Sequence, residues 1–145
     1  MSYQGLYGDF YQKQQWLSSF GLSGNHNYCA VFVSHSLQKA QASYPPRSSF
    51  AVDFIRNNSI PARYVARGTY QIQRGDIVVW SKGARHVGIA IESWQHAEGL
   101  TIEGNTSPGP YSDLTNRSIR GIFVKQRSAS PGHPFRITYV TNVYY

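Results

Sequence analysis

The chain contains a single cysteine, Cys29, at the point where a polar loop gives way to an apolar stretch with helical spacing. Asn25 and Asn27 before it supply the chemistry of a helix cap, so we expect Cys29 at the N-terminus of a helix. Exposed backbone N–H groups and the positive end of the helix dipole favour a thiolate there, and the thiolate is the nucleophilic form of cysteine. A lone cysteine is more often a small buried hydrophobic residue. Its role therefore depends on what other residues the chain supplies.

Acyl transfer by a cysteine also needs an imidazole and a polar group that fixes the imidazole tautomer. His86 stands at the start of a predicted strand, Val87–Ile91, while Glu103 ends another strand and Asn105 follows two positions later. Residues two apart on a strand share a face, so we expect Glu103 and Asn105 to point the same way as His86, provided that Gly104 keeps an extended backbone. The carboxylate or carboxamide would then orient the Nδ1–H of His86. Taken singly, each of these residues is more often a solvated surface residue.

The elements that position these residues divide the chain into two halves. Helical spacing of apolar residues predicts a first helix within residues 3–20, clearest from residue 9, and a second helix over about 28–42. A third, short helix is predicted through Phe50 to Ile55, with Ser48 or Ser49 as its cap.

After Pro61 the sequence changes to β-branched runs separated by turn residues. The predicted strands are residues 76–80, 87–91, 100–103, 119–126 and 135–140. Helices followed by a meander of antiparallel strands are typical of an α+β fold, with the helices packed on one side of a single antiparallel sheet. A length of 145 residues suits one domain.

Net charge, hydropathy and cysteine content limit the kinds of partner and cellular location that the chain can have. The formal net charge is +7 at pH 7, which favours anionic partners such as nucleic acid, anionic lipid or a bacterial envelope polymer. Because the basic residues are scattered rather than clustered in runs, we expect no nucleic-acid partner. The sequence shows neither a membrane span nor the pattern of a secretory signal in residues 1–20, so we expect no membrane insertion and no Sec signal. One cysteine excludes an internal disulfide.

Four stretches resemble, in order, the signature blocks of the CHAP family, the cysteine, histidine-dependent amidohydrolases/peptidases of the NlpC/P60 and papain-like superfamily. These stretches are Tyr28–Val33, Arg74–Trp80, Arg85–Ala90 and Ile102–Asn105. The separation of His86 from Glu103 is also typical of that family, and residues 121–127 look like its closing strand. The resemblance covers about residues 25–127 and makes the chain, 1–145, a single catalytic domain. It assigns no role to the C-terminal extension, residues 128–145.

The resemblance implies a papain-like core and hydrolysis of amide bonds in peptidoglycan. The bond cut would join muramic acid to L-alanine or lie within the stem and cross-bridge peptides. By the same resemblance, Cys29 is the nucleophile, His86 the general base and acid, Glu103 the group that orients His86, and Asn105 an auxiliary. The backbone N–H of Cys29, at the helix N-terminus, is our candidate oxyanion donor.

Two biological contexts fit such an enzyme: a phage lysin, or a toxin that one bacterium injects into another. Either would be made in the cytoplasm and act in the envelope of the target cell. A toxin would have an immunity protein or a secretion-system carrier as a further partner, and we expect the chain itself to be a monomer. The alternative is a non-catalytic module of the same fold that binds the envelope through its basic surface.

Three aromatic residues are weaker candidates for substrate binding. Tyr28 would line the cleft or pack in the core with equal ease, Trp80 is more often a core residue because it ends a buried strand, and Tyr70 approaches the sheet as a cleft wall. His26 and His35 flank Cys29, but their spacing matches no usual zinc site, and residues 23–27 lack the carboxylates of a calcium loop. We therefore expect no metal and no cofactor.

Overall fold

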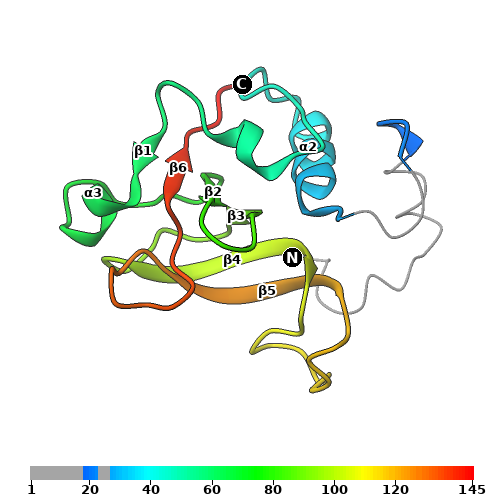
Figure 1. Ribbon diagram of the computed structural model, residues 1–145. Coiled ribbons are helices and arrows are strands. Elements are labelled where there is room, and N and C mark those ends of the chain that lie inside the picture. The colour runs from blue at the N-terminus through cyan, green and yellow to red at the C-terminus, as the bar shows by residue number, and fades with distance from the viewer. Residues whose placement is uncertain (1–17, 23–26) are drawn as a thin grey trace.

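One antiparallel sheet organises the part of the chain that the computed structural model describes, residues 18–22 and 27–145 (Figure 1). Its six strands lie in the order β1-β6-β2-β3-β4-β5. In chain order the elements are α2 (Cys29–Lys39), the 3-10 helix η1 (Ala51–Phe54), β1 (Ile60–Pro61), α3 (Ala62–Ala66), β2 (Ile77–Trp80), β3 (His86–Ala90), β4 (Glu98–Thr106), β5 (Gly121–Ser128) and β6 (Tyr139–Thr141). The prediction of mixed helix and strand around a single antiparallel sheet is confirmed.

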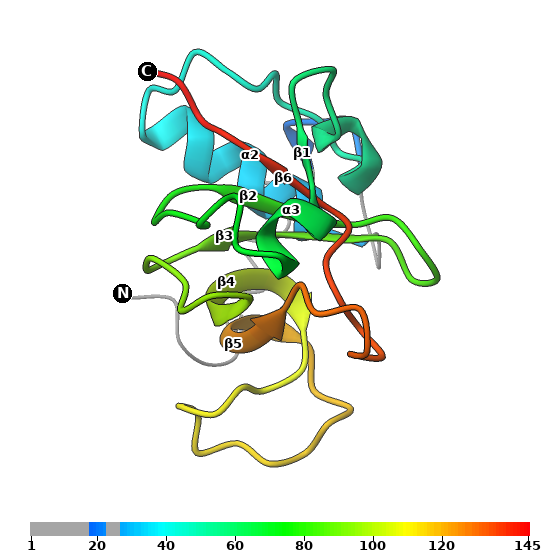
Figure 2. The same cartoon turned by 90° about the vertical axis from the view of Figure 1, so that its left-hand side faces the viewer.

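The centre of the sheet is a hairpin of β-branched residues. β2 and β3 pair with Trp80 opposite His86 and Ile77 opposite Ile89, so the turn between them places His86 at the very start of β3. β4 continues the sheet and pairs with β5 along most of its length. Figure 2 shows β2 to β5 following one another in this order. At nine residues, β4 is longer than the strand predicted at 100–103.

Residues alternate between the two faces of the sheet, and each face has its own hydrophobic cluster. Ile77 and Val79 pack with α2 and η1, whereas Val78 and Trp80 pack with α3 and with residues after β5. The expectation that all helices lie on one side of the sheet is therefore wrong, because α3 joins the opposite cluster. Figure 1 shows α3 well away from α2. Five residues are too few to show helical spacing, and α3 was not predicted.

α2 packs closely on the sheet because Gly104 presents no side chain to it. A Cβ at position 104 would lie 2.8 Å from Cβ of Phe32, a distance that real side chains do not adopt. The helix begins at Cys29 and ends at Lys39, shortly before the predicted end at Ala42. Gln41 adopts a left-handed backbone with φ of 60°, which is incompatible with continuation of the helix.

Other predicted elements are present in shorter form. η1 falls within the predicted third helix, but neither Ser48 nor Ser49 is its cap, because the N-cap residue is Phe50 and no side chain caps the helix. Ser48 holds the turn before the helix: the Phe50 N–H donates to Ser48 Oγ at 3.0 Å, and Ser48 Oγ donates to Asp53 at 2.6 Å. The strand predicted at 135–140 is represented only by β6. Most of the predicted helix at 3–20 lies outside the described residues.

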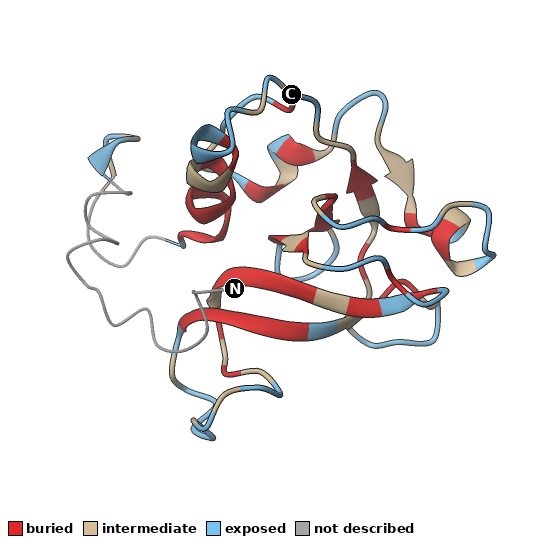
Figure 3. Ribbon diagram, turned by 180° about the vertical axis from the view of Figure 1, so that it is seen from behind, coloured by how far each residue is buried: buried red, intermediate tan, exposed pale blue. Residues whose placement is uncertain are grey.

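Buried residues cover β4, β5 and the inner side of α2, while much of the connection between β4 and β5 is exposed (Figure 3). Within residues 18–22 and 27–145, none of the helices has the length and apolar character needed to cross a membrane.

Candidate active site

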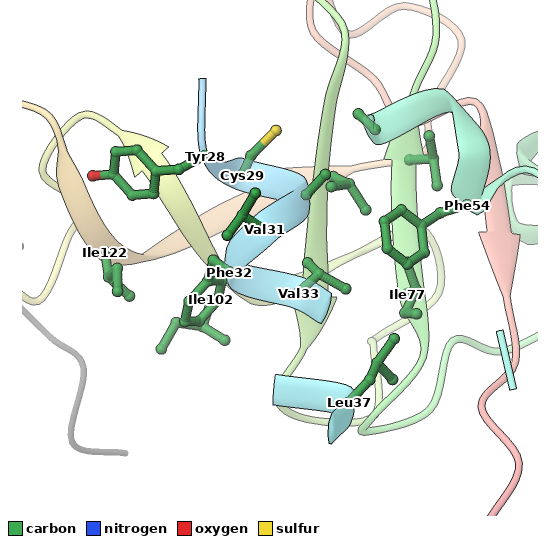
Figure 4. Packing of buried hydrophobic residues seen from close by; sticks show 14 residues of the cluster. Tyr28, Cys29, Val31, Phe32, Val33, Leu37, Phe54, Ile77, Ile102 and Ile122 are labelled. Carbon is green, nitrogen blue, oxygen red and sulfur yellow. The ribbon is translucent and has the colours of Figure 1, made fainter. Parts of the chain in front are cut away.

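Cys29 is the first residue of α2 and is 2% exposed. Figure 4 shows its sulfur pointing away from the neighbouring Val31 and Phe32 side chains of the hydrophobic cluster. The Cys29 thiol lies close enough to His86 to contribute to the raised pKa of the imidazole. The structure thus brings the predicted nucleophile and the predicted imidazole together, from a helix end and a strand start that are far apart in sequence.

His86 also contacts Glu103, since Nε2 of the imidazole lies 2.7 Å from Oε1 of the carboxylate. His86 is 8% exposed and Glu103 is completely buried. The sequence predicted a carboxylate on Nδ1, but the nitrogen that contacts Glu103 is Nε2. The nitrogen left for the Cys29 thiol is therefore Nδ1, on the other side of the ring.

The protonation of this pair follows from its surroundings. Burial by itself would lower the pKa of His86, but the Glu103 charge and the hydrogen bonds to Cys29 and Glu103 outweigh burial and raise that pKa to about 9. Burial would raise the pKa of Glu103, but hydrogen bonds from Arg127 and the charge of His86 hold it well below its usual range. At neutral pH the site therefore contains an imidazolium and a carboxylate.

Every oxygen of the buried Glu103 carboxylate has a donor. Arg127 donates from Nε to Oε2 at 2.7 Å and from Nη2 to Oε1, and Thr101 donates its hydroxyl to Oε2. Thr101 lies two residues before Glu103 and shares its face of β4. Arg127 reaches the same face because β5 pairs with β4 in the register that sets Arg127 opposite Gly99.

Sequence reasoning gave Arg127 no role. The odd-numbered positions of residues 121–127 carry two basic residues, Lys125 and Arg127, and a buried acid on the adjacent strand needs such a partner. That signal becomes usable only when the pairing of β4 with β5 is known.

Aromatic rings hold Arg127 and His86 in place. The Arg127 guanidinium lies over Trp80 and Phe135, 5.1 and 4.8 Å from the ring centroids, and the two rings stack on each other at 5.2 Å. Trp80 is also 5.2 Å from the His86 ring and is 1% exposed. Trp80 therefore supports the histidine from the core instead of offering a surface to substrate.

Asn105 lines the same cavity as His86, but its backbone does not follow the predicted strand. The pairing of β4 with β5 is irregular between Glu103 and Thr106, and Asn105 has a left-handed backbone with φ of 52°. The prediction that Glu103 and Asn105 share a face required an extended backbone through Gly104 and Asn105. The backbone is not extended at Asn105, so that requirement is not met. Asn105 donates instead from Nδ2 to Oδ1 of Asn27 at 2.9 Å, close to the beginning of α2.

The Asn27 side chain accepts a hydrogen bond from the backbone N–H of Cys29, the donor that was expected to bind an oxyanion. The N–H of Cys29 donates to Asn27 Oδ1 at 3.2 Å. Asn27, Asn105 and His86 all line one cavity, so the two amides stay beside the reactive groups. Sequence reasoning treated Asn27 only as a cap residue.

Tyr28 and Tyr70 have structural positions. Tyr28 is 2% exposed within the α2 cluster, and burial raises its pKa to about 12. The Tyr70 hydroxyl donates to Asp76 at 2.7 Å and accepts from Asn142 at 2.7 Å. Neither tyrosine is among the described residues that line the cavity beside His86.

No group of three histidine, cysteine, aspartate or glutamate side chains within the described residues could hold a metal ion. Nε2 of His35 lies 3.0 Å from the Ser19 hydroxyl. His26 and most of the loop considered for calcium, residues 23–26, lie outside the described residues.

The chemistry available here is nucleophilic substitution at an acyl carbon. A thiol contacts one side of an imidazole, and a buried carboxylate fixes the other side, which is the arrangement that lets an imidazole take and return a proton. Searches of protein-family models, of curated proteins and of solved structures each find no match to this chain. The contacts of Cys29, His86 and Glu103 are therefore the basis for its functional assignment.

Proposed function

We propose that this protein is a cysteine hydrolase that cleaves an amide bond in peptidoglycan, as an N-acetylmuramoyl-L-alanine amidase or as an endopeptidase of the stem or cross-bridge peptides. The observation that carries the proposal is the contact of one buried imidazole with both Cys29 and Glu103. Peptidoglycan as the substrate comes from the resemblance of four sequence blocks to CHAP enzymes. The family assignment and its papain-like core are part of the proposal.

In the proposed reaction, Cys29 attacks the amide carbonyl as a thiolate, and an S-acyl enzyme forms as the C–N bond breaks. His86 starts as the imidazolium that its raised pKa favours, and it gives its proton to the departing amine. A water molecule then attacks the acyl group while His86 takes the water proton. The thiolate leaves and the free acid is released. Glu103 remains ionised throughout and holds the ring.

The developing oxyanion needs donors close to Cys29. With its oxygen on the Cys29 N–H, the Asn27 side chain has its amide nitrogen, Nδ2, free to act as one such donor in the cavity. A rotation of that side chain would release the backbone N–H as an alternative donor. We propose the Asn27 side chain as an oxyanion donor in place of the Cys29 backbone N–H.

The experiment that tests the proposal is digestion of purified peptidoglycan with analysis of the soluble fragments by mass spectrometry. New amine and carboxyl ends at one defined bond are expected, and the fragment masses identify that bond. Cys29→Ala and His86→Ala should produce no new ends. His96→Asn is the matched control, because His96 is exposed and Asn tolerates its left-handed backbone.

Two outcomes would contradict the proposal. Retention of the protein on peptidoglycan without any new ends would instead favour a non-catalytic envelope-binding module. Full cleavage by the Cys29→Ala protein would exclude Cys29 as the nucleophile. The same digestion on living target cells, with the protein added outside or expressed in the periplasm, separates the lysin context from the injected-toxin context.

A further inference from the structure

A cavity of about 340 Å³ opens beside His86, and its lining is strongly basic. Besides His86, five arginine and lysine side chains border it: Arg85, Arg117, Arg120, Lys125 and Arg127. No aspartate or glutamate is among the described residues of the lining. A volume of this size suits a small polar group or one residue of a larger substrate.

Two of the five cations have structural tasks. Arg127 is bound to Glu103. Lys125 donates from Nζ to the carbonyl and hydroxyl oxygens of Ser107 at 3.2 and 3.0 Å. Lys125 thereby fastens the beginning of the connection between β4 and β5 to the sheet. Neither side chain is free to be a main ligand for a bound molecule.

The other three cations, Arg85, Arg117 and Arg120, are exposed, and none forms an ion pair with a carboxylate of the described residues. Arg117 and Arg120 belong to the connection between β4 and β5, which extends away from the sheet in Figures 1 and 2. The beginning of α2 lies close to the start of this connection, where Asn27 contacts Asn105. The free guanidinium groups and the reactive thiol therefore border the same region.

These charges act on one another. Burial lowers the pKa of Lys125, and the charges of Arg127, Arg117 and Arg120 lower it further against the attraction of Glu103, to about 8. Among residues 18–22 and 27–145, the carboxylate in contact with these groups is Glu103, and it is already fully hydrogen-bonded. The cavity therefore carries an excess of positive charge that an anion would neutralise.

We infer that this cavity is an anion subsite that binds a carboxylate of a peptide substrate beside the scissile amide, with Arg117 and Arg120 as its principal ligands. A guanidinium group matches a carboxylate through two parallel hydrogen bonds. A peptide is favoured over a phosphate polymer because it carries the scissile amide and the carboxylate in one molecule, at the spacing of neighbouring residues. The assignment of substrate class rests on the proposed amide hydrolysis.

The test is a binding measurement that does not require turnover. Soluble stem peptides from peptidoglycan are prepared in two forms, one with free carboxylates and one with these groups converted to carboxamides. Isothermal titration calorimetry then measures the affinity of each form for the Cys29→Ser protein at fixed ionic strength. The carboxylate form should bind at least roughly tenfold more tightly.

A double variant, Arg117→Gln with Arg120→Gln, should reduce that preference to within about threefold. The matched control is Arg63→Gln with Arg67→Gln, which removes the same charge from exposed residues that flank and belong to α3, outside the cavity. This control variant should bind the carboxylate form of the peptide in preference to the carboxamide form as strongly as the parent protein does.

Equal affinity for the two peptide forms, an unchanged preference in the Arg117 and Arg120 variant, or no binding of either form would overturn the subsite. Binding of a polyphosphate polymer without binding of the stem peptides would overturn it as well and point to a phosphate ligand. Carboxylate-dependent binding by Cys29→Ser, combined with no cleavage of intact peptidoglycan by the wild-type protein, would leave the subsite standing and contradict the proposed hydrolase. The two proposals therefore fail in distinguishable ways.

Discussion

Gly88 lies directly against Glu103: a Cβ at position 88 would stand 2.7 Å from Cγ of Glu103 and 3.2 Å from the Ile102 carbonyl oxygen. The absence of a side chain on β3 thus provides the space through which the carboxylate of β4 reaches His86. A residue without any reactive group is in this way part of the geometry of the site.

The substitution Gly88→Ala should displace the Glu103 side chain from its place beside His86. We expect a loss of about 1–3 kcal/mol in the free energy of unfolding, as for other overpacked sites, and a larger fall in kcat than change in KM. Urea unfolding and the rate of peptidoglycan digestion measure the two effects. Gly132→Ala is the control, because a Cβ there meets no atom within 4 Å. Equal behaviour of the two variants would exclude this role for Gly88.

The substitution Glu103→Gln should both destabilise the protein and inactivate it. Removing the charge leaves Arg127 and the imidazolium of His86 without their buried counter-ion, which typically costs roughly 3–5 kcal/mol. The pKa of His86, raised to about 9 in the wild type, should fall, and NMR titration of the imidazole protons measures the shift. Glu98→Gln, at an exposed position of the same strand, should change none of these quantities. A His86 pKa that is unchanged in Glu103→Gln would show that another group sets it.

The substitution Arg127→Lys keeps the positive charge but loses the guanidinium plane that lies between Glu103 and the rings of Trp80 and Phe135. Lysine cannot supply two parallel hydrogen bonds to one carboxylate. We expect a stability loss of about 1–3 kcal/mol and a fall in kcat with little change in KM, since Arg127 acts on the reaction only through Glu103. Full activity of Arg127→Lys would mean that charge alone holds Glu103.

The stability of the protein should depend on pH in a defined direction. His86 has a higher pKa in the folded state, about 9, than the ordinary value of 6.5, so the folded protein binds more protons between these two pH values. The stabilisation is complete below pH 6.5 and is lost as pH rises towards 9, at up to about 1.4 kcal/mol per pH unit. Urea unfolding at a series of pH values should show this decline, and His86→Gln should abolish it.

Lys125 has the opposite effect on stability: its contribution makes the free energy of unfolding rise as the pH rises. Its pKa is lowered from 10.5 to about 8 in the folded state, so its unfavourable contribution is relieved as pH rises from 8 to 10.5. The decline between pH 6.5 and about 7 therefore reports on His86 with little contribution from Lys125. A Lys125→Met variant should leave the decline below about pH 7 unchanged, make it steeper towards pH 8 and remove any recovery above pH 8. A flat profile between pH 6.5 and 8 in the wild type would contradict the raised pKa of His86.

How far sequence reasoning succeeds here depends on the range of the interactions involved. β2 and β3 were predicted because their β-branched runs are local signals, and Cys29 was placed at a helix start by the apolar spacing after it. Arg127 was missed because its partnership with Glu103 depends on the register of β4 against β5, which no local pattern reveals. The backbone at Asn105 was not predicted, because its left-handed conformation after Gly104 breaks the alternation of faces on which the prediction relied, although Asn105 still lines the cavity beside His86.

The connection between β4 and β5 has a consequence for how such a protein can diversify. The thiol, the imidazole and the carboxylate are mounted on α2, β3 and β4, whereas Arg117 and Arg120 belong to an exposed segment that Lys125 secures at its root. Under the two proposals, exchange of that segment for one of another charge would alter which molecules are bound without disturbing Cys29, His86 and Glu103. Selectivity and reactivity would then belong to physically separate parts of the fold and be open to independent evolution.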